Sequence, residues 1–301
     1  MKLLTADYTM KEIKLFDFDN RFTKDYLRWC TDHPEANDPD KLELMIPHMH
    51  KQWMNTPKKW LDGLSPVDYF KNIDDIQHYL TLFIEYIKNG ISVPEPLLDC
   101  IIERKEDAYP TFLNILYSKC PDDMDQETFT DLLAAVVSLI NEMDLKHPLT
   151  LYVQKLSEAG EFNDFNDEIF ETLENNISVP GLKDSILNAY SICTEDYGKK
   201  CLLELLSHYS EDDDKIKGLI RDLFSSAEKD DIPFYGSLMI KANDDKALEY
   251  LERSIKRKDI DYYTYRTLAD LIESLTGEEY YDDRDFTGDE YYEMLISDDE
   301  Q

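Results

Sequence analysis

Glycine is scarce in this sequence, with 9 residues in 301, and proline is modest at 12. So few turn-forming residues exclude glycine-rich phosphate loops and argue against sandwiches and propellers, which turn every 8–12 residues or so. The chain also lacks the GxGxxG, GxxxxGK[ST], GxSxG and HExxH patterns. No signature of nucleotide, ester or zinc-peptidase chemistry therefore supports an enzyme, and we expect no cofactor.

Positive charge is the second shortage. The chain carries 32 Lys and Arg against 65 Asp and Glu, a formal net charge of −33, with a pI near 4.4. Phosphate contacts require clustered Lys and Arg, so we expect neither nucleic acid nor an anionic membrane as a partner. Complementary potentials accelerate association, which favours a protein partner with a basic surface.

Long apolar runs and paired cysteines are also missing. No stretch approaches the ~18 consecutive apolar residues of a membrane span, and the first residues lack a signal-peptide core. The five cysteines are odd in number and scattered, without a CxxC pair. Reduced thiols in the cytoplasm are the interpretation we favour. Apolar residues at 42% and aromatics at 12% are sufficient for a folded core.

Apolar residues recur at three-and-four spacing from about residue 73 to residue 275, and no segment alternates as a strand does. The sequence therefore predicts an all-α fold. Gly90 follows the first of these stretches as a C-cap. The expected buried faces include Ile73, Ile76, Leu80, Phe83, Ile84 and Ile87, then Phe129, Leu132, Leu133, Val136, Val137, Ile140 and Met143, and later Leu268, Leu271, Ile272 and Leu275.

Two internal matches indicate repeats. Ile91-Ser-Val-Pro94 recurs as Ile177-Ser-Val-Pro180, 86 positions later. Half of that distance falls within the ~40–47 residue period of HEAT and armadillo repeats. The segment from Pro94 to Tyr117 also aligns without gaps on Pro233 to Lys256, so that Ala108 matches Ala247 and Phe112 matches Leu251.

On these residues, positions 73–275 resemble a HEAT-like or armadillo-type α-solenoid of bacterial type. The resemblance implies a right-handed superhelix of antiparallel helix pairs, stacked in sequence order, with a long surface for binding other proteins. An irregular helical bundle is the alternative fold.

Residues 1–72 form a predicted helical N-terminal cap, with helices at about 18–32 and 41–55. All three tryptophans lie here. We expect Thr56 and Ser65, each followed by Pro, to cap two short turns joined through Gly63. Trp53 and Trp60 would pack these turns against the helix at 73–87.

The same segment, Trp53-x-Asn55-Thr56-Pro57-x2-Trp60 and onward to Pro66, resembles short segments of assorted bacterial proteins. These include the toxin-binding C-terminal region of some antitoxins. The resemblance makes Trp53, Asn55, Pro57 and Trp60 candidate partner-binding residues. A purely structural cap is the alternative that we favour.

Residues 276–301 form a predicted acidic tail. From Glu278 to Gln301 there are 11 acidic residues and one base, Arg284. Charge of this density is typical of a solvated segment. The interleaved aromatics leave open a docked segment or a partner-binding tail, with Tyr280, Tyr281, Tyr291 and Tyr292 as candidates.

Two catalytic or metal hypotheses arise from short patterns. Asp17-x-Asp19 after an apolar run resembles the first motif of haloacid-dehalogenase-like phosphatases, where the first Asp attacks phosphorus. Arg21 departs from that pattern, and the required parallel sheet is not predicted, so a helix cap is the alternative. Candidate Zn²⁺ ligands for a metal-dependent hydrolase are Cys30, His33, His48 and His50, although His-x-His within a helix points its rings apart.

The hypothesis that the sequence favours is a non-enzymatic, cytoplasmic scaffold, monomeric, that binds a basic protein. The alternative is an acidic decoy or antitoxin-like antagonist of a toxin or a nucleic-acid-binding protein. The densest basic run, Arg253-Ser-Ile-Lys256-Arg257-Lys258, is expected to neutralise neighbouring acids and the negative end of the helix that begins near Lys246.

Overall fold

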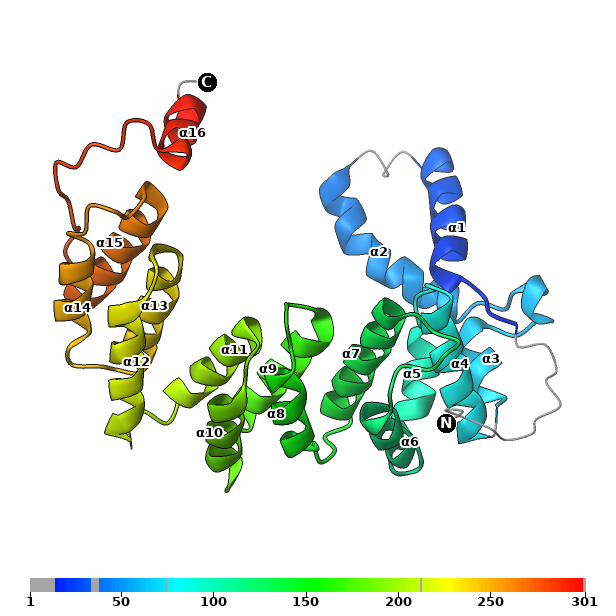
Figure 1. Ribbon diagram of the computed structural model, residues 1–301. Coiled ribbons are helices and arrows are strands. Elements are labelled where there is room, and N and C mark those ends of the chain that lie inside the picture. Colours follow the sequence, from blue (N-terminus) through cyan, green and yellow to red (C-terminus); the bar gives the residue numbers. More distant parts are fainter. Residues whose placement is uncertain (1–13, 34–37, 74, 212, 300–301) are drawn as a thin grey trace. The chain divides into compact units, whose positions relative to one another are not determined.

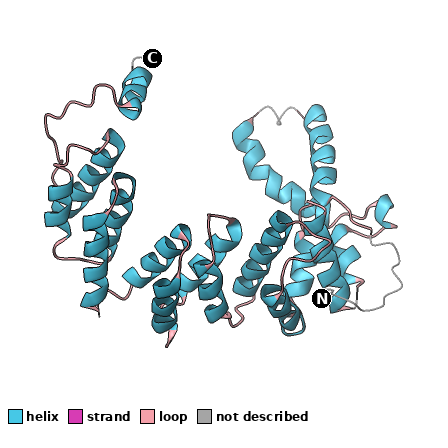
Figure 2. Ribbon diagram, viewed as in Figure 1, coloured by secondary structure: helices cyan, strands magenta, loops and turns pink. Residues whose placement is uncertain are grey.

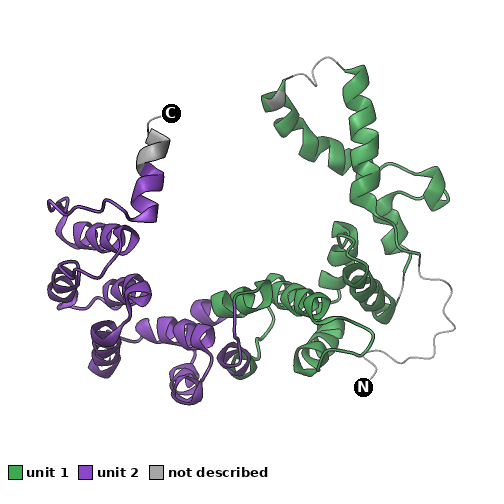
Figure 3. Cartoon of the chain, turned by 45° about the horizontal axis from the view of Figure 1, so that its top comes forward, with its two compact units in different colours: residues 1–151, 162–172 green, residues 152–161, 173–301 purple. Residues whose placement is uncertain are grey.

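The computed structural model describes residues 14–33, 38–73, 75–211 and 213–299. Every regular element in these ranges is a helix, and they contain no strand (Figure 2). The predicted all-α fold is confirmed. The chain divides into two compact units, unit 1 with residues 1–151 and 162–172 and unit 2 with residues 152–161 and 173–301 (Figure 3).

Unit 1 holds the first half of the helices (Figure 1). In chain order these are α1 (Phe18–Asp32), α2 (Pro39–Met54), the 3₁₀ turn η2 (Lys59–Leu61), α3 (Pro66–Lys71), α4 (Ile76–Lys88), α5 (Glu95–Ile102), α6 (Lys105–Tyr117) and α7 (Gln126–Glu142). Two further helices, α8 (Leu149–Ser157) and α9 (Asp164–Asn175), give residues to both units.

Unit 2 holds the remaining helices. These are α10 (Leu182–Ile192), α11 (Asp196–Ser207), α12 (Asp214–Ser226), the 3₁₀ turn η3 (Lys229–Asp231), α13 (Ile232–Lys241), α14 (Ala247–Ser254), α15 (Tyr262–Thr276) and α16 (Glu290–Asp299).

Several of the acidic residues cap the N-termini of these helices. A side-chain oxygen just before the first turn accepts a hydrogen bond from a backbone N–H two or three residues later, which satisfies one of the orphan donors of the helix. A carboxylate there also faces the positive end of the helix dipole. The residues in this role are Asp17, Asp38, Ser65, Asp75, Asp125, Asp213 and Asp261.

The helices pack as neighbouring pairs in sequence order. In unit 1, α4 packs on α5 and α6 on α7, and in unit 2 the pairs are α10–α11, α12–α13 and α14–α15. Successive pairs in unit 2 are joined by α11–α12 and α13–α14 contacts. Each helix buries one apolar stripe in its pair, which is the packing of a solenoid-like all-α fold. The predicted face of α7 is buried throughout, from Phe129 to Met143.

Two details of the predicted helices can be compared directly. Gly90 ends α4 with φ +61°, and the Ile91 N–H donates to the Tyr86 carbonyl, so the predicted C-cap is confirmed as a Schellman motif. Leu275 is 42% exposed, although its spacing placed it on the buried face of α15. It lies in the last turn, beyond the contacts that bury Leu268 and Ile272.

The spacing of the pairs is shorter than the sequence indicated. In unit 2 the first helices of successive pairs begin at Leu182, Asp214 and Ala247, which are 32 and 33 residues apart rather than 43. The two Ile-Ser-Val-Pro segments precede α5, the second helix of its pair, and α10, the first of its pair. Their match therefore joins positions that are not equivalent in the fold.

The longer internal match does join equivalent positions. Pro94–Tyr117 covers α5 and α6, and Pro233–Lys256 covers most of α13 and then α14, in both cases the second helix of one pair and the first of the next. Ala108 and Phe112 are fully buried, and Ala247 and Leu251 are at most 1% exposed. The predicted correspondence of these four buried residues is confirmed.

Helices α1 and α2 form a separate arm, named here the α1–α2 arm. The two helices meet at one end, where the Phe22 ring lies 4.8 Å from the His50 ring and 5.8 Å from the Trp53 ring, and stand apart toward the other end (Figures 1 and 3). Among the described side chains of the arm, only Phe18, Trp53 and Met54 are buried.

Candidate functional site

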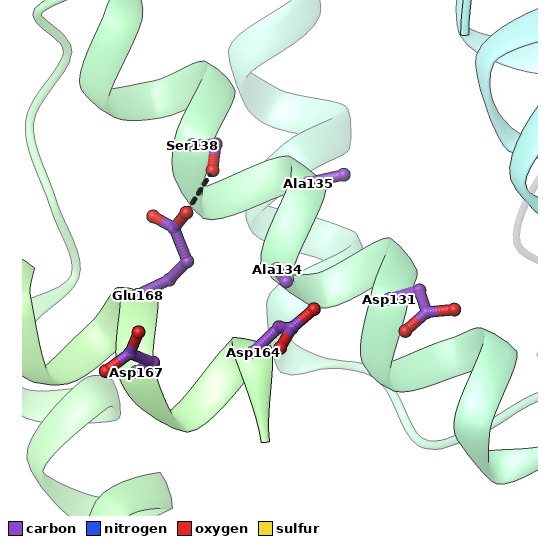
Figure 4. A pocket seen from close by; sticks show the side chains of 7 residues that line it. All are labelled: Asp131, Ala134, Ala135, Ser138, Asp164, Asp167 and Glu168. Carbon is purple, nitrogen blue, oxygen red and sulfur yellow. Dashed lines mark hydrogen bonds between the residues drawn. The ribbon is translucent and has the colours of Figure 1, made fainter. Parts of the chain in front are cut away.

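An acidic groove opens between α7 and α9 within unit 1 (Figure 4). Its volume is about 350 Å³, enough for a lysine or arginine side chain. Positions i, i+3, i+4 and i+7 of α7 form one wall and positions i, i+3 and i+4 of α9 form the other, because such residues share a helix face. The lining residues are Asp131, Ala134, Ala135, Ser138, Asp164, Asp167 and Glu168.

Two side-chain hydrogen bonds hold the walls of the acidic groove together. The Ser138 hydroxyl donates to the Glu168 carboxylate at 2.6 Å. One turn further along each helix, the Asn141 amide donates to the Thr172 hydroxyl at 3.1 Å. The short side chain of Ala135 leaves space between the helices where a larger residue would fill the groove.

All the charged side chains that line the acidic groove are negative. Asp131, Asp164 and Asp167 are exposed, and none of them makes an ion pair with a residue in the described ranges. Glu168 adds a fourth carboxylate, and the lining contains no base. A concave surface with charges of one sign concentrates the field, so the groove attracts a cationic group.

The tryptophans at the base of the α1–α2 arm are structural contacts. Trp53 is 9% exposed, and its indole N–H donates to the Asp25 carboxylate at 2.9 Å. Trp60 is half-buried, with its ring 5.2 Å from the Phe16 ring and the Arg21 guanidinium 4.1 Å above it.

Phe16 links this base to α4. The predicted packing of the Trp53 and Trp60 indoles on that helix stays a prediction. The Tyr86 hydroxyl of α4 donates to the Phe16 carbonyl at 3.1 Å and accepts from the Phe16 N–H at 3.2 Å. Burial raises the pKa of Tyr86 to about 12, so this hydroxyl keeps its proton as a donor.

The other residues of the tryptophan segment lie at the surface. Pro57 is exposed, and the exposed Asn55 side-chain amide donates to the Lys51 carbonyl at 2.8 Å. The prediction that Thr56 caps a helix is wrong, because its hydroxyl donates to the Gln52 carbonyl at 2.7 Å and the 3₁₀ turn begins at Lys59. The predicted cap at Ser65 is confirmed.

The terminal segment, residues 278–299, docks on unit 2. The Tyr262 ring of α15 lies 4.9 Å from Tyr292 and 5.1 Å from Phe286, and the Tyr265 ring lies 6.3 Å from Tyr280. The exposed Tyr291 ring meets Tyr263 edge-on at 5.8 Å. Tyr281 is 80% exposed. Of the four candidate tyrosines, three therefore pack on α15 and one points to solvent.

Arg284 is the basic residue of the terminal segment, and its contacts hold the segment on unit 2. Its guanidinium donates to the Ile255 carbonyl at 2.6 Å and to the Arg257 carbonyl at 3.0 Å, just beyond the end of α14. The same group lies 5.1 Å from the Tyr265 ring centre. These contacts favour the docked alternative over a freely solvated tail, and the described side chains of residues 278–295 remain exposed or half-buried.

The phosphatase hypothesis loses its site. Asp17 is the N-cap of α1, and its carboxylate accepts from the Asn20 N–H at 2.8 Å, which is the capping role expected as the alternative. Asp19 lies in the first turn of α1. The described ranges contain no sheet that could carry the remaining groups of such a phosphatase.

The candidate metal ligands are not brought together. The His33 Nδ1–H donates to the Trp29 carbonyl at 2.8 Å, and its ring stacks on the Trp29 ring at 4.2 Å. The His50 ring packs edge-on against Phe22, and His48 is exposed. Cys30 is a half-buried free thiol. In the described part of the chain no three His, Cys, Asp or Glu side chains are placed to hold a metal ion.

The basic run after α14 is used within the fold at one position. Arg257 donates to the Asp259 carboxylate through Nε at 3.0 Å and Nη2 at 2.7 Å, and this lowers the pKa of Asp259 to about 2. Arg253, Lys256 and Lys258 are exposed and make no ion pair with a described residue. Ion pairing with a neighbouring acid is therefore seen for Arg257, and Arg253 lies in the last turn of α14, at the negative end of that helix.

Sequence reasoning missed the acidic groove. Asp164, Asp167 and Glu168 at i, i+3 and i+4 do predict a negatively charged helix face. In a chain with 65 acidic residues such a pattern is not distinctive. That this face lies opposite Asp131 and two alanines of α7 follows only from the packing of the two helices.

Comparison of the chain with family models, with curated proteins and with solved structures found no match in any of the three. Among the described helices, none combines the length and the apolarity needed to cross a membrane. The fold and the groove therefore define the class: an all-helical protein of neighbouring helix pairs that presents an acidic groove on unit 1.

Proposed function

We propose that this protein is a non-enzymatic scaffold that binds a partner protein through basic side chains, with the acidic groove as the contact site. The observation that carries the proposal is the groove itself, which is lined by four carboxylates and no base. The HEAT-like resemblance supports the scaffold role, because stacked helix pairs commonly offer their surface to other proteins.

The charge of the whole chain supports a basic partner. With 65 acidic and 32 basic residues, at least 33 carboxylates lack a base of their own in the chain. The resulting negative field attracts basic surfaces and repels nucleic acids and anionic lipids. It raises the association rate at low salt more than it raises the affinity.

The groove supplies the specific part of the interaction. An exposed ion pair contributes only ~0–1 kcal/mol, so a single contact would not hold a partner. Several carboxylates around one Lys or Arg side chain form a network and add hydrogen bonds to the charged group. We place the protein in the cytoplasm, since the five cysteines are free thiols.

The test is a titration with a fluorescent peptide rich in Lys and Arg, beside an acidic peptide of equal length. We expect the basic peptide to bind at ~50 mM salt and to weaken strongly at ~500 mM, because exposed charges are screened beyond a few ångströms there. The triple variant Asp131→Asn, Asp164→Asn, Asp167→Asn should weaken binding at least about tenfold, or ~1.4 kcal/mol.

The matched control removes three exposed charges from unit 2, in the variant Glu249→Gln, Glu252→Gln, Glu273→Gln. It removes three negative charges, the same number as the groove variant. It should change the affinity less than about threefold, a shift of ~0.6 kcal/mol. Equal losses in both triple variants would mean that the general field binds the peptide. That result, or no binding at ~50 mM salt, would refute the groove as the site.

A further inference from the structure

The terminal segment lies on a surface of unit 2 that is built by α15 and by the turn between α14 and α15. We name this surface the α15 seat; it is formed by Tyr262, Tyr263, Tyr265 and the turn residues 255–258. Rings of the segment meet the tyrosines, and Arg284 reaches the turn. In addition, the Tyr262 N–H donates to the Asp289 carboxylate at 3.0 Å. The seat therefore accepts a segment that carries rings and acids together.

The α15 seat is held in place by contacts that do not involve the terminal segment. Leu268, Ala269 and Ile272 are buried, and α15 packs on α13 and α14. By contrast, no side chain of residues 278–295 is buried, and the rings that meet the seat are half-buried or exposed. A segment held in this way opens locally without unfolding the helices beneath it.

The local charge around the α15 seat differs from the charge of the segment that lies on it. Residues 246–270 contain six basic and five acidic residues, a net charge of +1, within a chain of net charge −33. Residues 278–299 contain ten acidic residues and one basic residue, a net charge of −9. The charge near the seat therefore does not oppose an acidic segment, as the mean charge of the chain would.

The terminal segment leaves part of the recognition capacity of this region unused. Arg253, Lys256 and Lys258 are exposed and make no ion pair with a described residue. Tyr263 is 56% exposed, although the Tyr291 ring meets it edge-on. A ligand whose carboxylates reach these bases gains charge-assisted hydrogen bonds that the terminal segment does not make.

We propose that the α15 seat is a binding site for an acidic, tyrosine- or phenylalanine-bearing segment of another protein, and that the terminal segment occupies this site as an intramolecular competitor. The rings of the partner take the places of Phe286 and Tyr292 beside Tyr262, and its carboxylates pair with the exposed bases. Clustered bases recognise acidic motifs in this way in other peptide-binding proteins.

The competition makes the site self-inhibited. A partner binds only the fraction of molecules in which the terminal segment is open, so the apparent dissociation constant is the intrinsic one divided by that fraction. This proposal goes beyond the proposed function and does not rest on it, because the seat lies on unit 2 and takes a ligand of the opposite charge to that expected at the acidic groove.

The test is a titration of the full chain with a fluorescent peptide that copies residues 278–293, beside a scrambled peptide of the same composition. The double variant Arg284→Ala, Phe286→Ala weakens the hold on the terminal segment. We expect it to bind the peptide at least about tenfold more tightly than the wild-type chain, because more of the seats are open. Its circular dichroism spectrum should be unchanged, since neither side chain is buried.

The matched control removes the same two residue types from unit 1, in the variant Arg28→Ala, Phe162→Ala, where both side chains are exposed. It should bind the peptide as the wild-type chain does. Adding Arg253→Gln, Lys256→Gln and Lys258→Gln to the double variant should weaken binding at least about threefold at ~50 mM salt, because these bases then no longer attract the acidic peptide.

Four results would overturn the proposal: no gain in the double variant, an equal gain in the control, equal binding of the scrambled peptide, or no loss when the three bases are removed. A double variant that dimerises without peptide, measured by sedimentation velocity, would instead assign the α15 seat to the terminal segment of a second copy and would also overturn it. The basic-peptide titration reads the acidic groove separately, so either proposal can fail alone.

Discussion

The α1–α2 arm and the terminal segment both flank the packed helix pairs, and they differ in what holds them. The arm contains helices of 15 and 16 residues, yet its buried side chains gather at one end. The terminal segment has one helix of 10 residues and a loop, but its rings contact three tyrosines of α15. Arg284 adds hydrogen bonds to two backbone carbonyls.

The difference shows that charge density does not decide which segment is docked. The terminal segment is the most acidic part of the chain, and the arm has no net charge. Tyrosines interleaved with acids can turn their rings toward α15 while the carboxylates stay in water, because a tyrosine ring is apolar and its hydroxyl is polar. The position of apolar partners therefore decides docking.

The largest effect is expected at the base of the arm. Trp53→Ala removes a buried indole and its hydrogen bond to Asp25, and should lower the free energy of unfolding by about 4 kcal/mol. Leu44→Ala, on the open part of the arm, should change it by less than about 0.5 kcal/mol. Chemical denaturation measures the free energy of unfolding of both variants. Similar losses in the two variants would contradict a separation between base and open arm.

The helices of unit 2 pack closely enough at one point for backbone to meet backbone, whereas α1 and α2 of the arm meet through side-chain rings. A Cβ on Gly198 of α11 would lie 2.3 Å from the Leu156 carbonyl oxygen, whereas a Cβ on Gly218 of α12 would meet nothing within 4 Å. Gly198→Ala should therefore destabilise the protein by about 3 kcal/mol, because backbone must move. Gly218→Ala should stabilise it by about 0.5 kcal/mol through helix propensity. Thermal unfolding compares the two, and a neutral Gly198→Ala would contradict the packing of α11 on the end of α8.

A buried ion pair in unit 2 gives a pH test. The Asp244 side chain is 1% exposed and is bound by both sides of the Arg221 fork. Burial by itself raises the pKa of Asp244. The hydrogen bonds and charge of Arg221 lower the pKa by a larger amount, so it lies below its ordinary value. The stabilisation is therefore present above the unfolded pKa of about 4 and is lost as the pH falls through the folded pKa.

Asp244→Asn should lower the free energy of unfolding by about 2 kcal/mol at pH 7, as expected for losing hydrogen bonds to a charged group. The difference from the wild-type protein should shrink as the pH falls from about 5 to 2, because the wild-type carboxylate then becomes protonated. Urea denaturation across this range measures the difference. A difference in the free energy of unfolding that stays constant from about pH 5 to 2 would mean that the charge of Asp244 does not stabilise the fold.

The smallest effect is expected for the terminal segment. Arg284→Ala removes two hydrogen bonds to carbonyls, about 1.4 kcal/mol of local stability, and should accelerate amide exchange of residues 286–293 about tenfold. Arg266→Ala is the control, since Arg266 pairs with Asp270 on the exposed side of α15 and does not reach this segment. Unchanged exchange in Arg284→Ala would show that the rings alone hold the segment.

Local order along the chain could be read from the sequence. The spacing of apolar residues predicted the helices and the buried face of α7, and Gly90 and Ser65 predicted two helix ends, because these signals act within one or two turns. The 24-residue match between Pro94–Tyr117 and Pro233–Lys256 also located equivalent positions, since it extends over two helices.

Shorter signals failed for a physical reason. The four matching residues Ile-Ser-Val-Pro precede the second helix of one pair and the first helix of another, because a turn of this kind can precede any helix. Thr56 before Pro57 has the pattern of a cap, but its hydroxyl finds a closer acceptor in the last turn of α2. Local propensity gives way where a nearby backbone carbonyl offers a better bond.

By itself the sequence determined the helical class and the acid excess, because composition and periodicity are local properties. Only the tertiary structure decided which surfaces are free. The acidic groove exists because α9 packs beside the alanines of α7, and the terminal segment docks because three of its tyrosines meet α15 and Arg284 reaches the end of α14. Such contacts join residues about 30 positions apart, a distance at which no spacing rule of a single helix operates.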